Sequence, residues 1–220
     1  MSVRPRHPGI ERDHRQGIAR VRVQEGCRLS CGCRDRLAAM DRQTLARLVN
    51  DRCRLEGTFT LRSGQVSNYY FDKYLFESDP ELLREVVAHA IPLIPAGTEV
   101  LAGLELGGVP LATALSLATR LEVVFVRKAA KPYGTAKLAE GTDVMGRRLL
   151  VVEDVITTGG QVVTSAGDLR RLGAVVDNVL CVIDRSDGSH DRLRAAGLEL
   201  SAVFTADDLA AAAGGVSEHR

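Results

Sequence analysis

The feature of the sequence that most constrains the fold is an alternation of short apolar runs with amphipathic stretches from about residue 99 onward. The apolar runs have the length and composition of strands buried on both faces. Strands are predicted at residues 99–103, 123–126, 148–154, 176–184 and 199–204, and helices at residues 110–120, 160–172, 188–196 and 206–213. This order predicts an α/β fold with a mainly parallel central sheet flanked by helices.

Two further amphipathic helices are predicted before these strands, at residues 42–53 and 80–93, with Pro80 near the start of the second. The connection between the second and third strands breaks the alternation. Residues 128–147 are polar, contain glycine and show no sustained helical pattern. Long connections of this kind in compact domains are usually functional, so we expect a loop that acts on a ligand.

Charge is distributed unevenly along the chain. The formal net charge is +1, yet residues 1–39 contain nine Arg and only four acidic residues. This segment has no aromatic residue that could stack on bases, so nucleic-acid binding is an alternative that we do not favour. We expect residues 1–39 to be a disordered, Arg-rich extension, followed by one folded domain over residues 40–220.

Three cysteines within this extension form a C-x3-C-x-C cluster, Cys27, Cys31 and Cys33. The spacing matches no common zinc pattern, and no histidine follows closely enough to complete a site. We therefore favour ordinary thiols in a reducing compartment over a metal site.

No part of the sequence has the character of a membrane span. The apolar runs fall short of the roughly 18 residues that a spanning helix needs, and the N-terminal region lacks the apolar core of a secretory signal. We expect a cytoplasmic protein with neither a membrane nor a nucleic acid as its partner.

Residues 151–160, VVEDVITTGG, place two adjacent acids at the end of a predicted strand and a turn rich in hydroxyls and glycine after it. Ligands of open α/β sheets bind beyond the carboxyl ends of the strands. A glycine-bearing turn that opens a helix presents backbone N–H groups and the positive end of the helix dipole to an anion. Glu153 and Asp154 can accept hydrogen bonds from vicinal hydroxyls, so the segment fits a ribose 5-phosphate. Taken alone, it fits a helix cap beside two solvated acids equally well.

This segment resembles the phosphoribosyl pyrophosphate (PRPP) signature of the type I phosphoribosyltransferase family. Further segments resemble the orotate phosphoribosyltransferases of that family, so that the resemblance covers roughly residues 42–210. They are a substrate hood at residues 59–72, a pyrophosphate loop at residues 100–115, a catalytic loop at residues 125–141 with the pattern R-K-x-x-K-x-x-G, and Arg185 after a strand.

The resemblance implies the type I phosphoribosyltransferase fold, with a small N-terminal hood over roughly residues 40–78, a core over roughly residues 79–213 and a flexible catalytic loop. It also assigns roles to individual residues. Catalysis is expected of Lys131, Asp154 and Glu153. PRPP binding is expected of Arg62, Gly107, Gly108, Arg127, Lys128, Lys131, Tyr133, Glu153, Asp154, Val155, Ile156, Thr157, Thr158, Gly159, Gly160 and Gln161. Orotate binding is expected of Arg62, Tyr70, Phe71, Thr157 and Arg185.

The chain departs from the common family pattern in two of these segments. The pyrophosphate loop often carries a lysine at the position of Gly107, so one charge contact is in doubt. In the catalytic loop, Ala129, Pro132 and Tyr133 stand where the family often has Glu, Asp and His. Pro132 would stiffen that loop.

The implied reaction is transfer of the phosphoribosyl group of PRPP to N1 of orotate, which gives orotidine 5′-phosphate and pyrophosphate in pyrimidine biosynthesis. The resemblance implies Mg²⁺ as the cofactor, held mainly through PRPP and water with no direct protein ligand. It also implies a homodimer whose catalytic loop reaches the neighbouring subunit's site. A transferase for a purine base and a PRPP-sensing regulator remain as alternatives.

Overall fold

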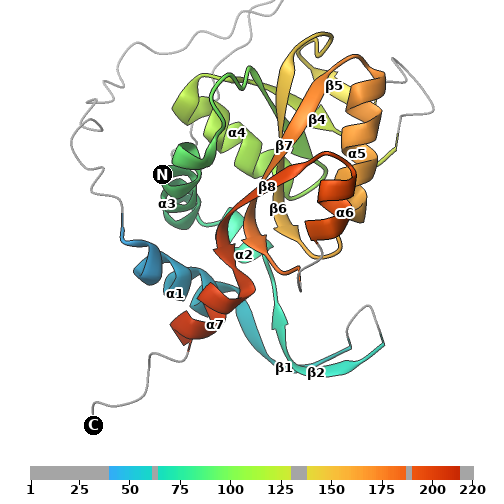
Figure 1. The fold of residues 1–220 in the computed structure, drawn as a ribbon. Helices are drawn as coiled ribbons and strands as arrows, with labels where there is room; N and C mark the ends of the chain where they lie inside the picture. Colours follow the sequence, from blue (N-terminus) through green and yellow to red (C-terminus); the bar gives the residue numbers. More distant parts are fainter. Residues whose placement is uncertain (1–39, 61–63, 130–137, 187–189, 214–220) are drawn as a thin grey trace, which may run out of the picture. The chain divides into compact units, whose positions relative to one another are not determined.

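The computed structural model describes residues 40–60, 64–129, 138–186 and 190–213, which all lie in one compact unit, Ala38–Arg220. A six-stranded sheet with strand order β5-β4-β3-β6-β7-β8 forms its centre (Figure 1). The parallel strands are β3 (Val100–Leu104), β4 (Glu122–Val126), β6 (Arg148–Ile156), β7 (Val175–Asp184) and β8 (Glu199–Thr205). The predicted strands and the mainly parallel sheet are therefore confirmed.

One strand of this sheet was not predicted. β5 (Ala139–Gly141) pairs antiparallel with β4 at the edge of the sheet, within the connection for which the sequence indicated no regular element. It is three residues long, and a period-2 pattern cannot be recognised over so short a run.

Helices cover both faces of the sheet. They are α1 (Arg42–Cys53), α3 (Pro80–Ala90), α4 (Gly108–Thr119), α5 (Gly160–Arg171), α6 (His190–Ala195) and α7 (Ala206–Ala213). The predicted helix over residues 80–93 is too long, since α3 passes into a 3₁₀ turn, η1 (Ile91–Leu93), at Pro92. Proline has no N–H with which to continue the α-helical hydrogen bonds.

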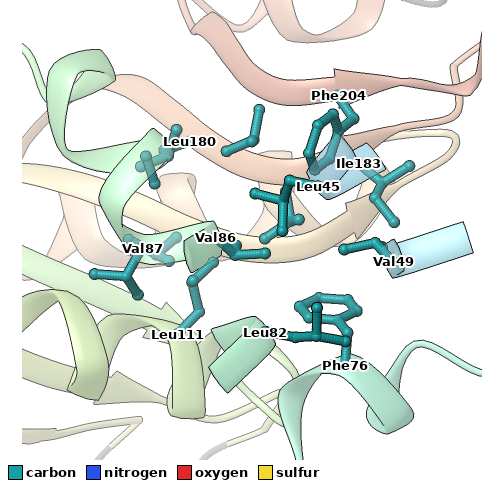
Figure 2. Close-up of a cluster of buried hydrophobic side chains, with 14 of the residues drawn as sticks. Leu45, Val49, Phe76, Leu82, Val86, Val87, Leu111, Leu180, Ile183 and Phe204 are labelled. Atoms are coloured by element: carbon teal, nitrogen blue, oxygen red, sulfur yellow. The ribbon is translucent and has the colours of Figure 1, made fainter. Parts of the chain in front are cut away.

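Two buried clusters hold these layers together, because alternate residues of each strand point to opposite faces. Leu180 lies in one cluster with Leu45 of α1 and Leu111 of α4 on one face (Figure 2). Leu150 belongs to the same cluster. On the other face, buried residues of the strands pack against α5 and α6. Every residue of β3 is buried, as expected for a strand covered on both sides.

The region between α1 and α3 forms an antiparallel hairpin of β1 (Arg54–Thr60) and β2 (Val66–Phe71), followed by a short helix, α2 (Tyr74–Glu77). Phe76 of α2 is fully buried in the first cluster and lies beside Leu82 (Figure 2). This single aromatic side chain anchors α2 against the core, and α2 in turn supplies side chains to the candidate site.

Among the helices of the described residues, none combines the length and the apolar character that crossing a membrane requires.

Candidate active site

The end of β6 and the start of α5 form the floor of the candidate site. β6 continues to Ile156 instead of ending at Asp154 as predicted, so both acids lie within the strand. The chain then turns through two exposed threonines and Gly159, whose φ of 67° is in the left-handed region that favours glycine. α5 begins at Gly160 without a side-chain cap, which leaves the amides of its first turn for an anion.

Asp154 is fully buried beneath this turn. The backbone N–H of Val155 donates to its Oδ1 at 2.5 Å, and Nζ of Lys73 lies 2.5 Å from its Oδ2. Burial favours the neutral acid, but the contacts with Glu153 and Lys73 outweigh it and lower the pKa of Asp154. Asp154 is therefore an ionised carboxylate at neutral pH, with its charge balanced by Lys73.

Glu153 has the opposite character. It is half-buried, and its Oε1 accepts the backbone N–H of Asp154 at 3.3 Å. Burial, together with the hydrogen bond and the charge of Asp154, raises the pKa of Glu153. The adjacent acids thus form an unequal pair, in which Asp154 holds the negative charge and Glu153 tends to retain its proton.

Gly107 and Gly108 lie against β6 at the start of α4. A Cβ on Gly107 would be 1.5 Å from Oδ2 of Asp154, and a Cβ on Gly108 would be 2.2 Å from the carbonyl oxygen of Val152. The resemblance assigns both glycines to PRPP binding, where a backbone without side chains can approach an anion closely. The structure adds a second reason, since any side chain at either position would collide with β6.

The base of the predicted catalytic loop adjoins the pyrophosphate loop. The N–H of Lys128 donates to Oε2 of Glu105 at 3.1 Å, and the N–H of Arg127 donates to the carbonyl oxygen of Leu138 at 2.9 Å. Nε of Arg127 lies 3.9 Å from Oε1 of Glu140. The other residues assigned to this loop, Lys131, Pro132 and Tyr133, lie outside the described residues.

The structure brings together two of the residues predicted to bind orotate. The guanidinium of Arg185 lies 5.9 Å from the ring centroid of Phe71, and its backbone N–H donates to the carbonyl oxygen of Ile156 at 2.8 Å. Tyr70 is exposed and its ring lies 5.6 Å from that of Phe59. Arg62 lies outside the described residues. A basic and aromatic surface therefore adjoins the end of β6.

Four residues near these groups were missed in the sequence. Lys73 and Glu77 flank Asp154, Glu105 holds the loop base, and a guanidinium nitrogen of Arg192 would lie 3.1 Å from a Cβ on Gly160. Lys73 and Glu77 are four residues apart, which is compatible with one helical turn, but this spacing does not indicate a contact with Asp154.

Within the described residues, no group of three or more His, Cys, Asp or Glu side chains is arranged to hold a metal ion. The half-buried Glu153 can accept a hydrogen bond from coordinated water, whereas Asp154 is fully buried. This donor set fits a Mg²⁺ ion that arrives on its substrate and keeps several waters.

Known proteins resemble this chain over most of its length. No family model matches the chain. The orotate phosphoribosyltransferase of a Nocardioides species is 54% identical over 169 residues, which cover 77% of this chain and 94% of the relative. That of Halobacterium salinarum is 45% identical over 153 residues, covering 70% and 87%.

Solved structures give the same result. Orotate phosphoribosyltransferase from Mycobacterium tuberculosis superposes with a TM-score of 0.70 at 34% identity, covering 77% of this chain and 99% of that one. The complex of that enzyme with PRPP superposes at 0.67 and 32%, covering 78% and 99%. An adenine phosphoribosyltransferase from Thermoanaerobacter pseudethanolicus, at 18% identity and 0.56, shares the fold alone. The chain has the type I phosphoribosyltransferase fold and belongs to the orotate phosphoribosyltransferase family.

Proposed function

We propose that the chain transfers the phosphoribosyl group of PRPP to N1 of orotate and releases pyrophosphate, using the site at the end of β6. The observation that carries this proposal is the buried, ionised Asp154 directly before an uncapped helix start, with Arg185 and Phe71 beside it. An anionic sugar ester and an acidic planar base fit these two halves of the site. PRPP is also the ligand named for the similar M. tuberculosis structure.

The 5-phosphate of PRPP is assigned to the segment from Val155 to Gln161. Its backbone amides lie at the start of α5, where the helix dipole favours negative charge, and Thr157 and Thr158 add hydroxyl groups. A phosphate with up to two negative charges is held here without a lysine. Arg192 adds a positive charge close to Gly160.

Glu153 and Asp154 are assigned to the ribose. As the bond from C1′ to pyrophosphate breaks, its electron pair leaves with the pyrophosphate and the sugar gains oxocarbenium character. A fixed carboxylate near the ring stabilises that positive charge without having to reorganise. Orotate N1 then supplies the electron pair for the new bond and gives up its proton, which the departing pyrophosphate can accept. No covalent enzyme intermediate is needed.

The departing pyrophosphate is assigned to Arg127, Lys128, Lys131 and Tyr133, with the backbone at Gly107 and Gly108. Positive groups here act where negative charge accumulates in the transition state. Mg²⁺ bound to PRPP would add positive charge to the same oxygens. Lys131 is proposed as the most rate-sensitive of these side chains, so that Lys131→Ala lowers turnover strongly without changing the fold.

Orotate is assigned to Arg185, Phe71, Tyr70, Arg62 and Thr157. The guanidinium of Arg185 can form paired hydrogen bonds to a carboxylate, which a purine base lacks. The aromatic rings of the hairpin offer flat faces to a planar base. This surface therefore favours an acidic pyrimidine over a neutral purine.

The assembly remains part of the proposal. We assign residues 40–78 to a hood and residues 79–213 to a core, and we propose a homodimer in which the catalytic loop serves the neighbouring site. The proposed location is the cytoplasm.

A single assay tests the function. Purified protein is incubated with PRPP and either orotate, uracil, hypoxanthine or adenine, with and without Mg²⁺, and the loss of base absorbance is followed. Loss of orotate absorbance alone, dependent on PRPP and Mg²⁺, is the expected result. Conversion of a purine without conversion of orotate would show a different base specificity, and no conversion of any base would refute an enzymatic role.

A further inference from the structure

The short helix α2 places two charged side chains beside Asp154. Lys73 stands directly before α2 and Glu77 is its last residue, so the two are four residues apart and share one side of the helix. Nζ of Lys73 lies 2.5 Å from Oδ2 of Asp154. Phe76 stands between these two residues in the sequence, and its burial in the core fixes α2 in this position.

Within the described part of the chain, two buried carboxyl oxygens, one in α2 and one beside it, lack a hydrogen-bond partner of normal geometry. Oε1 of Glu77 and, despite its ion pair with Lys73, Oδ2 of Asp154 have no hydrogen-bond partner of normal geometry among the described residues. Buried carboxyl oxygens are almost always hydrogen-bonded. One proton shared between the two carboxyl groups would satisfy both atoms, with Glu77 as the donor and Asp154 as the acceptor.

The protonation pattern agrees with this arrangement. Burial, followed by the hydrogen bond and the charge of Asp154, raises the pKa of Glu77, whereas the pKa of Asp154 is lowered. Burial disfavours the charged form of Lys73, but its contact with Asp154 raises its pKa above the usual value. The three groups therefore form a neutral acid, a carboxylate and an ammonium.

Gly107 of the pyrophosphate loop also adjoins Oδ2 of Asp154. Since a Cβ at this position would overlap Oδ2, no side chain can enter from the pyrophosphate loop while Asp154 keeps its place. The positive charge next to Asp154 comes from α2 instead. Lys73 and Gly107 therefore both adjoin the Oδ2 atom of this carboxylate.

We propose that Lys73 and Glu77 are positioning residues that hold the carboxylate of Asp154 in place for the ribose of PRPP. Lys73 acts by its charge, and Glu77 acts by donating a hydrogen bond. This inference rests on the proposed function of Asp154. It makes α2, to which the sequence assigned no site residue, a determinant of catalysis. The side chains act through Asp154 and need not touch the substrate.

Paired substitutions separate positioning from a purely structural role. Glu77→Gln keeps a hydrogen-bond donor of the same size, whereas Glu77→Ala removes it; Lys73→Arg keeps the charge, whereas Lys73→Met removes it. Glu81→Ala and Arg84→Met are matched controls, because these side chains form an exposed ion pair on α3. For each variant, kcat and KM for PRPP and for orotate are measured together with the melting temperature.

The expected result is a fall of about 10- to 100-fold in kcat/KM for PRPP in Glu77→Ala and Lys73→Met, the range typical of lost outer-shell contacts. Glu77→Gln, Lys73→Arg and both controls should stay within about threefold of the parent, well below that range. KM for orotate should not change in any variant. Should Lys73→Met fail to fold, Lys73→Gln is measured in its place.

Two results would overturn the inference. One is full activity in Glu77→Ala or in the charge-removing Lys73 variant, and the other is equal loss in Glu77→Gln and Glu77→Ala. Failure of the proposed function looks different, since the parent protein itself would then form no orotidine 5′-phosphate. In that case calorimetric titration of the same variants with PRPP still decides, because a variant that binds PRPP as the parent does would contradict the positioning role.

Discussion

The contact between α4 and β6 supports a sharp prediction about Gly108. In Gly108→Ala, the new Cβ would lie 2.2 Å from the carbonyl oxygen of Val152, whereas carbon–oxygen contacts are normally about 3.3 Å or longer. The obstacle is backbone, so it cannot rotate away, and α4 must move by about 1 Å to relieve the contact. Such overpacking costs about 1–3 kcal/mol, occasionally more.

Gly167 of α5 provides the matched control. Nothing lies within 4 Å of a Cβ built at this helical position, so Gly167→Ala should gain about 0.5–1 kcal/mol from helix propensity. The free energies of unfolding of the two variants should therefore differ by about 2–4 kcal/mol, in favour of Gly167→Ala. Gly108→Ala should also lose activity, because its displaced helix carries the pyrophosphate loop.

Urea denaturation followed by far-ultraviolet circular dichroism measures this difference, since the chain contains no tryptophan for fluorescence. A change in the midpoint at constant slope would report stability alone. If Gly108→Ala proved as stable as Gly167→Ala and as active as the parent, the close approach of α4 to β6 would be refuted.

Three further predictions follow from charged groups. Two guanidinium nitrogens of Arg42 donate to the two carboxylate oxygens of Asp208 at 3.0 and 2.6 Å, and these hydrogen bonds lower the pKa of Asp208. The pair therefore contributes to the free energy of unfolding above about pH 4, and the contribution is lost as the pH falls and Asp208 is protonated. Because the pair is largely exposed, Asp208→Asn should lower the free energy of unfolding by only about 1 kcal/mol at pH 7. Thermal melts should show a smaller loss at lower pH, and an equal loss at every pH would contradict this reasoning. Burial raises the pKa of Glu77 from 4.5 to about 8. The folded parent therefore binds more protons than the unfolded chain between these pH values, and it should lose stability relative to Glu77→Gln as the pH rises through them. Melting temperatures of the two proteins that change in parallel with pH would contradict the raised pKa. Arg185→Met should weaken orotate binding about 10- to 100-fold in calorimetry while PRPP binding is retained, and weakening of both would place Arg185 elsewhere.

The sheet could be predicted because strands buried on both faces need continuous apolar residues, and β3, β6 and β7 each contain such a run. β5 and α2 could not, since each has three or four residues and depends on its neighbours for its conformation. Their formation is decided by pairing with β4 and by the burial of Phe76, which are tertiary contacts.

The candidate site divides in the same way. The turn at Gly159 follows from a motif that could be recognised along the chain, whereas the nearness of Arg185 to Phe71 was implied only by the resemblance, which assigns both residues to orotate. The contact of Lys73 with Asp154 joins segments that are far apart in sequence, so no local pattern could indicate it. The collision of a side chain at Gly107 with Asp154 depends likewise on how α4 packs against β6.

The hydrogen bond from Arg127 to Leu138 has a consequence for how this enzyme can diverge. It joins the two ends of the connection between β4 and β5, so the sheet is complete whatever chain lies between them. Doubling the length of a flexible closed loop costs only about 0.6 kcal/mol of closure entropy. Insertions and replacements between these two residues are therefore expected to cost little folding free energy, so that variation in sequence there leaves the sheet intact.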